Sequence, residues 1–300
     1  MVYLFRLRTA VNRLWQVARL NARVAGLALR GRWMSPAHVA RGYDTVAPTY
    51  RDSWQQRLAP ITDELLQRLL SLNSSPIEIL DLGAGNGCVA KKLAAQHPNA
   101  RVTAVDVSSE MLCLARSNAP PNLVCAQADM LDFLRSYPAG GADWLVSTWA
   151  LGYSYYTKLF PLCSRALKPG GTFAFIVNYA DTLRPVFAAF SKCMFRFPEC
   201  VQLAAWPRFP RTWQALEKSL RQSGFTILHH ADGNHPIMPP PGEMLPWLRQ
   251  TGILSGFDQM MDLNATPGPA AFMEHELQQN RERIFHHYCL CIARKAPERC

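Results

Sequence analysis

The segment that most constrains the fold is residues 77–87, with the sequence IEILDLGAGNG. Its first six residues form a short apolar run of the kind that makes a buried strand. Residues 83–87 then have glycine at every second position, so the backbone can turn sharply and approach a ligand closely. A helix that begins after such a turn directs unpaired N–H groups toward the same place. The segment therefore predicts a ligand-binding turn between a strand and a helix.

The rest of the chain alternates predicted helices with short apolar runs. This alternation is typical of a parallel sheet with helices on both faces, and 300 residues suffice for one such domain with insertions. We therefore predict an α/β fold with a doubly wound sheet. The predicted strands cover residues 77–82, 101–106, 122–126, 143–148, 172–178, 225–229 and 288–294, and the predicted helices cover residues 59–72, 87–96, 108–117, 155–167 and 211–223.

The net charge of +10 is distributed unevenly along the chain. Residues 1–43 contain eight arginines and no acidic residue, which leaves 24 basic and 22 acidic residues in positions 44–300. A nearly neutral body argues against a groove for a polyanion on the main domain. We therefore expect no nucleic-acid partner.

Residues 1–40 are predicted to form a basic, amphipathic helical arm. Two interpretations are open: residues 1–30 contact an anionic membrane surface, or the helix packs on its own domain or on a second copy in a homodimer. No apolar run approaches the roughly 18–20 residues of a spanning helix. The apolar stripe comprises Leu4, Leu7, Val11, Leu14, Ala18, Ala22, Ala25 and Leu29, with Arg8, Arg13, Arg19, Arg23 and Arg30 opposite it.

Nine cysteines are scattered along the chain without a CxxC pair. They do not resemble the framework of a small disulfide-rich secreted domain, so we interpret them as reduced thiols. This pattern predicts a cytoplasmic protein, peripheral to a membrane where the arm binds lipid. No spacing of histidine, cysteine or acidic residues predicts a metal site.

Two segments interrupt the alternation of helices and strands. Residues 181–210 are apolar, aromatic and basic, and residues 231–285 begin with a proline-rich stretch. Insertions of this size in an α/β domain usually form a lid or the wall of a binding site. We therefore expect an arm at 1–40 and one domain at 41–300, in which these two insertions form a lid over the substrate.

Three carboxylates at the ends of successive predicted strands indicate which ligand the glycine turn binds. Asp81 lies two residues before the first glycine, where it would repel a pyrophosphate and favour an amino group such as that of S-adenosylmethionine. Asp106 ends the second strand, where its oxygens could accept both hydroxyl groups of a ribose. Asp129 follows the third strand beside Met130, a pair suited to an adenine ring.

With these motifs, and with YDTVAPTY at 43–50, VDVSSEML at 105–112 and ALKPGGTF at 166–173, the sequence resembles the class I S-adenosylmethionine-dependent methyltransferases. Within that family it is similar to the quinone and natural-product enzymes. The resemblance implies a Rossmann-like sheet of order 3-2-1-4-5-7-6 and S-adenosylmethionine as the cofactor. It also implies which residues bind the cofactor. These are Asp81, Gly83, Gly85 and Gly87 at the methionine end, Asp106 at the ribose, and Asp129 with Met130 at the adenine. Tyr43 and Tyr50 would cover the cofactor, and Met111 and Trp149 are further cofactor-binding residues.

The family places the methyl-transfer site after the fourth strand, here residues 147–153, which are partly aromatic and contain no acid. We expect an enzyme whose substrate is a small, largely apolar or aromatic molecule, methylated on oxygen, nitrogen or carbon. His229 and His230 are candidate bases by residue type, and Tyr153 is a candidate catalytic residue. Two alternatives stay open: methylation of a phospholipid headgroup at a membrane, and a protein that binds the cofactor without transferring methyl.

Overall fold

The computed structural model describes residues 2–50, 54–72, 74–205, 208–264 and 268–297, with side chains from Leu14 onward. The chain forms two compact units. The sheet unit comprises residues 43–182, 207–235 and 285–300, and the helical unit comprises residues 1–42, 183–206 and 236–284. The predicted arm and most of both predicted insertions therefore belong to one unit.

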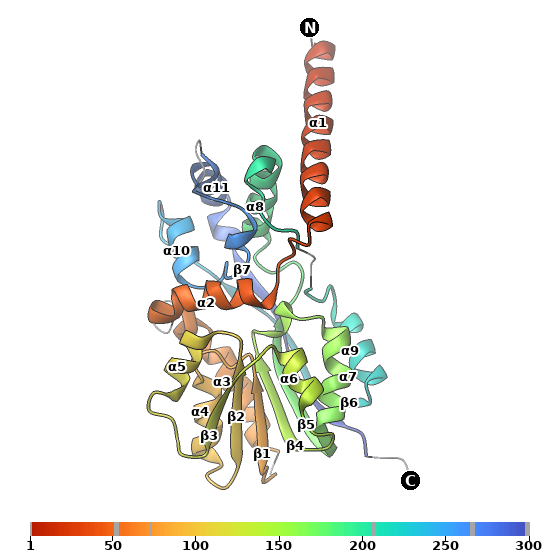
Figure 1. Cartoon of the computed structure of the whole chain (residues 1–300), viewed down its shortest axis with the longest axis vertical. Coiled ribbons are helices and arrows are strands. Elements are labelled where there is room, and N and C mark those ends of the chain that lie inside the picture. Colours follow the sequence, from red (N-terminus) through yellow and green to blue (C-terminus); the bar gives the residue numbers. More distant parts are fainter. Residues whose placement is uncertain (1, 51–53, 73, 206–207, 265–267, 298–300) are drawn as a thin grey trace. The chain divides into compact units, whose positions relative to one another are not determined.

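The sheet unit contains seven strands in the order β3-β2-β1-β4-β5-β7-β6, which confirms the predicted fold (Figure 1). Strands β1 to β5 are parallel, and β7 runs antiparallel to β5. The ends of the parallel strands therefore meet at one edge, where open α/β sheets bind ligands. The strands are β1 (Glu78–Leu82), β2 (Arg101–Asp106), β3 (Leu123–Gln127), β4 (Ala142–Thr148), β5 (Leu167–Asn178), β6 (Phe225–Pro236) and β7 (Phe285–Lys295).

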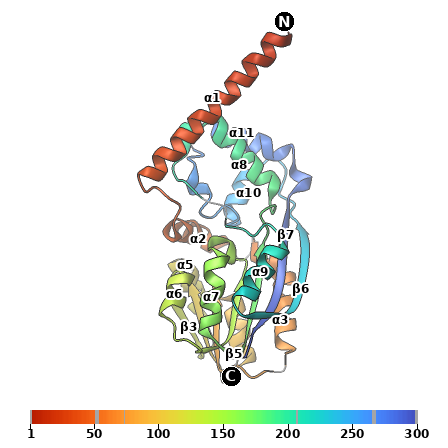
Figure 2. The ribbon, with the colours of Figure 1, turned by 90° about the vertical axis from the view of Figure 1, so that its right-hand side faces the viewer.

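Helices cover both faces of this sheet because its central strands are apolar on both sides. On one face α3 and α4 pack around Ile79 and Val102, and on the other α6, α7 and α9 pack around Leu80 and Phe173. Figure 2 shows α3 and α7 on opposite sides of the sheet. The helices with residues in this unit are α2 (Pro36–Tyr50), α3 (Gln56–Leu70), α4 (Cys88–Gln96), α5 (Ser109–Arg116), α6 (Met130–Ser136), α7 (Tyr156–Ala166) and α9 (Trp213–Gln222), with the 3-10 turn η2 (Leu151–Tyr153).

Three predicted strand boundaries were wrong, and one of them is the start of β7, which begins at Phe285 instead of at residue 288. Strand β5 begins at Leu167, so the Lys168-Pro169-Gly170-Gly171 turn lies within it. Strand β6 continues to Pro236 instead of ending at residue 229, so residues 231–235 are strand and not insertion. In β6 exposed residues alternate with more buried ones, and its second half is polar. An edge strand of this kind lacks the continuous apolar run that marked the central strands.

The helical unit contains α1 (Val2–Leu29), α8 (Arg184–Arg196), α10 (Met244–Gln250) and α11 (Pro269–Gln278). Helix α1 packs through Leu20 and Leu27 against Val201 and Ala204. Among the described residues, no helix is long and apolar enough to cross a membrane. The short 3-10 turns of this unit are η3 (Pro198–Cys200), η4 (Asp258–Met260) and η5 (Arg281–Arg283).

The buried face of α1 is not the predicted apolar stripe. Leu14 and Leu29 of that stripe are 70% and 89% exposed, and Trp15 beside it is 65% exposed. The side chains of the stripe residues Leu4, Leu7 and Val11, and those of Arg8 and Arg13, lie outside the described residues. Over residues 14–29 the stripe therefore stays uncovered, while a second, narrower face packs on the unit.

Candidate cofactor site

The glycine turn follows β1 and has the backbone geometry that its sequence predicts. Gly83, Gly85 and Gly87 all have positive φ angles, of 73°, 55° and 74°. A Cβ atom on Gly83 would lie 2.2 Å from the Cβ of Ala150, and one on Gly87 would lie 2.8 Å from the Cβ of Ala115. At Gly85 no atom lies within 4 Å of that position. Gly83 and Gly87 are therefore needed for packing, whereas Gly85 faces open space beside the turn.

Asp81 is 1% exposed, and neither of its carboxylate oxygens has a hydrogen-bond partner among the described residues. The backbone N–H of Ala90 influences it without reaching normal hydrogen-bond geometry. Burial, with a smaller contribution from the nearby Asp106 carboxylate, raises the pKa of Asp81 to about 7. A buried carboxylate without a partner is costly to the folded protein. A cationic group bound beside the turn would supply the missing partner.

Asp106 lies at the end of β2 and is held against the same turn. Its Oδ2 accepts from the Gly85 N–H at 2.7 Å, and its Oδ1 accepts from the Ser108 N–H at 2.9 Å. Burial raises the pKa of Asp106, and these hydrogen bonds oppose the rise. Because a carboxylate oxygen can accept more than one hydrogen bond, the group can still receive ligand hydroxyls while its orientation is fixed.

Asp129 and Met130 are also brought to this edge of the sheet. Oδ1 of Asp129 caps α6 by accepting from the N–H groups of Leu131 and Asp132, at 2.9 and 3.3 Å. The Met130 methyl group lies 3.6 Å from the position that a Cβ of Gly83 would occupy. The capping role therefore leaves one oxygen of Asp129 for another donor, and Met130 covers the turn.

Three tyrosines form one cluster near Asp106. The hydroxyl groups of Tyr43 and Tyr153 lie 2.9 Å apart, and the Tyr43 ring packs edge-on against the rings of both Tyr50 and Tyr153. Burial, then the neighbouring tyrosines and Asp106, raises the pKa of Tyr43. Asp44, which the sequence reasoning missed, accepts a hydrogen bond from the Ser108 hydroxyl at 2.5 Å. This hydrogen bond connects the segment that contains Tyr43 and Tyr50 to the start of α5.

Two tryptophans near the turn have defined positions. Trp149 follows β4 with a φ angle of 65°, which is uncommon for a residue other than glycine. Its Nε1 donates to the Thr62 hydroxyl at 3.1 Å. Trp54 is buried one residue before Gln55, which accepts from the Asn86 amide in the glycine turn. Both tryptophans are therefore next in sequence to residues that contact the turn.

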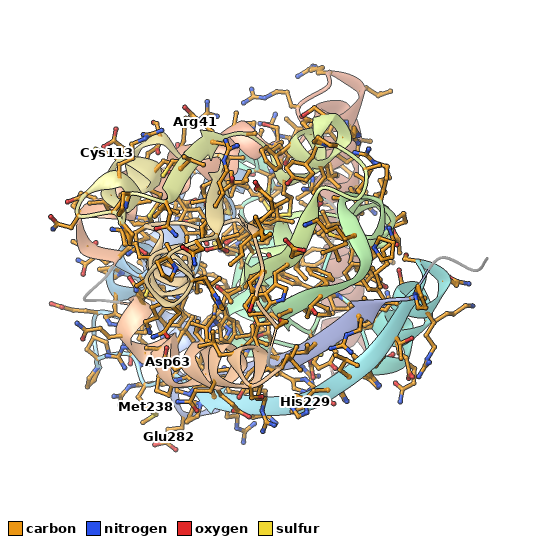
Figure 3. All side chains as sticks on the ribbon, turned by 90° about the horizontal axis from the view of Figure 1, so that it is seen from below. Arg41, Asp63, Cys113, His229, Met238 and Glu282 are labelled. Atoms are coloured by element: carbon orange, nitrogen blue, oxygen red, sulfur yellow. The ribbon has the colours of Figure 1, made fainter. Side chains whose placement is uncertain are left out.

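Met111 lies close to the tyrosine cluster, whereas the two predicted histidines lie elsewhere. Met111 is buried in one cluster with Val46 and Ala47, and Tyr43 and Tyr50 pack against that cluster. His229 lies on β6 near Arg68 and Glu64 of α3, and Figure 3 shows it at the edge strand. Burial, followed by the charge of Arg68, lowers its pKa. Neither His229 nor His230 has a contact with the tyrosine cluster among the described residues.

His230 stacks on Trp213 with ring centroids 3.6 Å apart, and its Nε2 lies 2.9 Å from Asp232 Oδ1. The side chains of His230, Asp232 and Cys289 place three possible metal-ligand atoms within 4.8 Å of one another. Asp232 also accepts a hydrogen bond from the Tyr179 hydroxyl.

The sheet order and this turn define the class of protein: a Rossmann-like domain with a glycine turn at the end of β1. The comparisons agree, since residues 79–171 match the model of a methyltransferase domain. The chain is 30% identical to the malonyl-[acyl-carrier protein] O-methyltransferase of Geobacter sulfurreducens, over 60% of this chain and 70% of the relative. The chain therefore belongs to the methyltransferase family.

Two other proteins are similar to this chain, one in sequence and one in structure. Trans-aconitate 2-methyltransferase of Streptomyces avermitilis is 37% identical over 40% of this chain, which spans 46% of that relative's length. The solved structure of the [4+2]-cyclase SpnF has a TM-score of 0.54 and 18% identity, and covers 86% of this chain and 95% of its own. At that identity the likeness shows the fold alone.

Proposed function

We propose that this protein transfers a methyl group from S-adenosylmethionine to a small, largely apolar or aromatic molecule. The observation that carries the proposal is the buried, unpaired carboxylate of Asp81 beside the glycine turn. Such a group favours a ligand with a cationic end, and the amino group of S-adenosylmethionine provides one. The family of the chain supports the same cofactor.

In this proposal, different residues near the turn hold different parts of the cofactor. Asp81 holds the amino group, Asp106 holds the ribose hydroxyls, and Asp129 with Met130 holds the adenine. Tyr43 and Tyr50 cover the cofactor from the side of α2. When bound, the cofactor supplies an electrophilic methyl group, and the chain aligns the acceptor with it. Trp149 and Tyr153 lie at the end of β4 and give the acceptor an aromatic surface.

The direct test is incubation of the full chain with methyl-labelled S-adenosylmethionine and the small-molecule fraction of its source cells. We expect one labelled organic product. Binding of the cofactor in calorimetry without any labelled product would favour the alternative of a cofactor-binding partner protein. Absence of binding would contradict the proposal as a whole.

Replacement of Asp106 by alanine is expected to weaken S-adenosylmethionine binding about 30-fold or more. The substitution removes two charge-assisted hydrogen bonds to ribose, each worth roughly 1–1.5 kcal/mol. Titration calorimetry measures the effect, and Asp132→Ala on the exposed side of α6 is the matched control. Unchanged affinity in Asp106→Ala would remove Asp106 from the site.

A second candidate function is methylation of a phospholipid headgroup, and the uncovered stripe of α1 favours it. Leu14, Trp15 and Leu29 are exposed on a helix whose segment contains no acidic residue. An apolar face flanked by arginine suits an anionic membrane interface. The same stripe would suit a second copy of the chain in a homodimer.

Replacement of both Leu14 and Trp15 by serine is expected to reduce binding to phosphatidylglycerol vesicles several-fold, because it removes exposed apolar area that would enter the interface. Co-sedimentation measures the effect. Leu114→Ser on α5, another exposed apolar residue, is the control. Equal binding by all three proteins would exclude the membrane role of this stripe, and loss of a dimer in the double variant would assign it to a partner subunit.

A further inference from the structure

His286 is a buried histidine that no sequence pattern singled out. It is the second residue of β7 and is 4% exposed, with its ring 5.2 Å from the ring of Trp54 and 5.6 Å from that of Trp149. Its Nε2 atom is buried and has no hydrogen-bond partner among the described residues. Buried polar atoms are nearly always paired, so a bound ligand or a water molecule is expected to supply the partner of Nε2.

Hydrogen bonds on the other side of the ring decide which nitrogen holds the proton. His286 Nδ1 lies 3.0 Å from Asn178 Oδ1 and 3.2 Å from the Thr182 hydroxyl. The Thr182 hydroxyl donates to Asn178 Oδ1 and accepts from the His287 N–H. Because Asn178 Oδ1 can only accept, Nδ1 must donate the hydrogen of the 3.0 Å contact. The proton is therefore on Nδ1, and Nε2 presents a lone pair.

The position of His286 connects this lone pair with the cofactor turn. Strand β7 is antiparallel to β5, so its first residues lie beside Asn178 at the end of β5, on the ligand-binding edge. Trp149 precedes Ala150, which packs on Gly83, and Trp54 precedes Gln55, which binds Asn86. Both aromatic neighbours of His286 are thus anchored to the turn from different directions.

We propose that Nε2 of His286 binds the hydroxyl group of the methyl acceptor and takes up its proton as the bond to the methyl carbon forms, which makes the protein an O-methyltransferase of a phenol or an alcohol. This inference rests on the proposed function. The hydroxyl donates its hydrogen to Nε2, and an oxygen lone pair forms the new bond to the methyl carbon. The carbon–sulfur bonding pair leaves with sulfur, and the hydroxyl proton moves to Nε2. Asn178 and Thr182 are positioning residues, since they fix the ring through Nδ1.

The same geometry argues against a carboxylate as acceptor. A carboxylate has no hydrogen to donate, and its oxygens would be repelled by the Nε2 lone pair. Burial, with a smaller contribution from His235, lowers the pKa of His286 to about 3, so the ring does not become a donor at neutral pH. The indole rings of Trp54 and Trp149 suit a flat, apolar acceptor. Among the described residues, the hydrogen bonds and ring contacts of His286 include no carboxylate that could hold a cationic acceptor.

The tautomer can be tested without knowing the acceptor. In ¹⁵N-histidine-labelled full chain, we expect His286 to show the Nδ1–H tautomer and to stay neutral from pH 8 to pH 5, with the signal assigned by its loss in His286→Phe. Asn178→Asp, which keeps the accepting oxygen, should retain this tautomer. An Nε2–H tautomer, or protonation near pH 6.5, would overturn the proposal.

The acceptor class is tested with 2-naphthol and 2-naphthoate, two rings that differ in the accepting group. We expect the methyl ether of 2-naphthol as the product and at least a 100-fold lower kcat in His286→Phe, since a positioned base contributes about 10²–10⁴-fold. The Kd for S-adenosylmethionine should stay within threefold, which separates this outcome from failure of the proposed function. His275→Phe on exposed α11 is the control. Preferential esterification of 2-naphthoate, or full activity in His286→Phe, would overturn the proposal.

Discussion

Replacement of Asp81 by asparagine is expected to weaken cofactor binding at least 100-fold while it stabilises the ligand-free protein. Asparagine has nearly the same shape but cannot carry the charge that pairs with the amino group of S-adenosylmethionine. Removing one partner of a buried charge pair costs about 3–5 kcal/mol, so the affinity should fall at least 100-fold. Titration calorimetry checks this part of the prediction.

The gain in stability follows from the raised pKa of Asp81. A pKa of about 7 in the folded state, against 3.8 without burial, means that the folded protein holds the proton more tightly than the unfolded chain. The resulting contribution to the free energy of unfolding is complete below pH 4 and is lost as the pH rises to 7, by on the order of 4 kcal/mol. Asp81→Asn avoids this loss, so its Tm should exceed that of the wild type at pH 8 and match it near pH 4.

The same residue should make cofactor binding depend on pH. Below pH 7 the Asp81 carboxyl must release its proton to bind the amino group, so the affinity should rise with pH and level off above 7. The Asp106 carboxylate on β2 raises the pKa of Asp81, and the Ala90 N–H on α4 lowers it, so both groups influence the pH at which binding levels off. In Asp81→Asn the dependence should disappear. A variant that bound tightly, or that was destabilised at pH 8, would contradict the role of an unpaired carboxylate that awaits a cation.

The sequence was most informative where local pattern and tertiary environment coincide. The strands that contain Ile79, Val102 and Val146 are apolar on both faces, so their limits were predicted to within one or two residues. The family resemblance supplied the order of the sheet. The glycine turn and the carboxylates near it follow one another along the chain, and this is why their common location at one sheet edge was predictable.

Features made by distant segments were not predictable in this way. His286 owes its tautomer to Asn178 and Thr182, more than 100 positions earlier in the chain, and its environment to Trp54 and Trp149. Local sequence instead drew attention to His229 and His230, which are adjacent to a predicted strand end that proved wrong. The helical unit combines three separate segments, and no local periodicity shows that they meet.

Alanine substitutions at Gly83 and Gly85 are expected to separate the folding role of the turn from its binding role. Gly83→Ala places a Cβ atom 2.2 Å from that of Ala150 in a backbone with positive φ, so both a clash and strain result. We expect a loss of about 2–4 kcal/mol in the free energy of unfolding. Urea denaturation measures it, and Ala150→Gly in the same chain should recover the part that is due to the clash.

Gly85→Ala should behave in the opposite way. Its Cβ atom would meet nothing within 4 Å, so only the positive φ angle costs stability, by about 1 kcal/mol. Gly140→Ala, with φ of 63° and equally open surroundings, is the matched control for that cost. In the proposed site the cofactor approaches the backbone through the open space beside Gly85. Gly85→Ala should therefore lose S-adenosylmethionine affinity, whereas Gly140→Ala should keep it. Equal affinities in these two variants would place the cofactor away from the turn. Asp81 would then have no cationic partner in the cofactor.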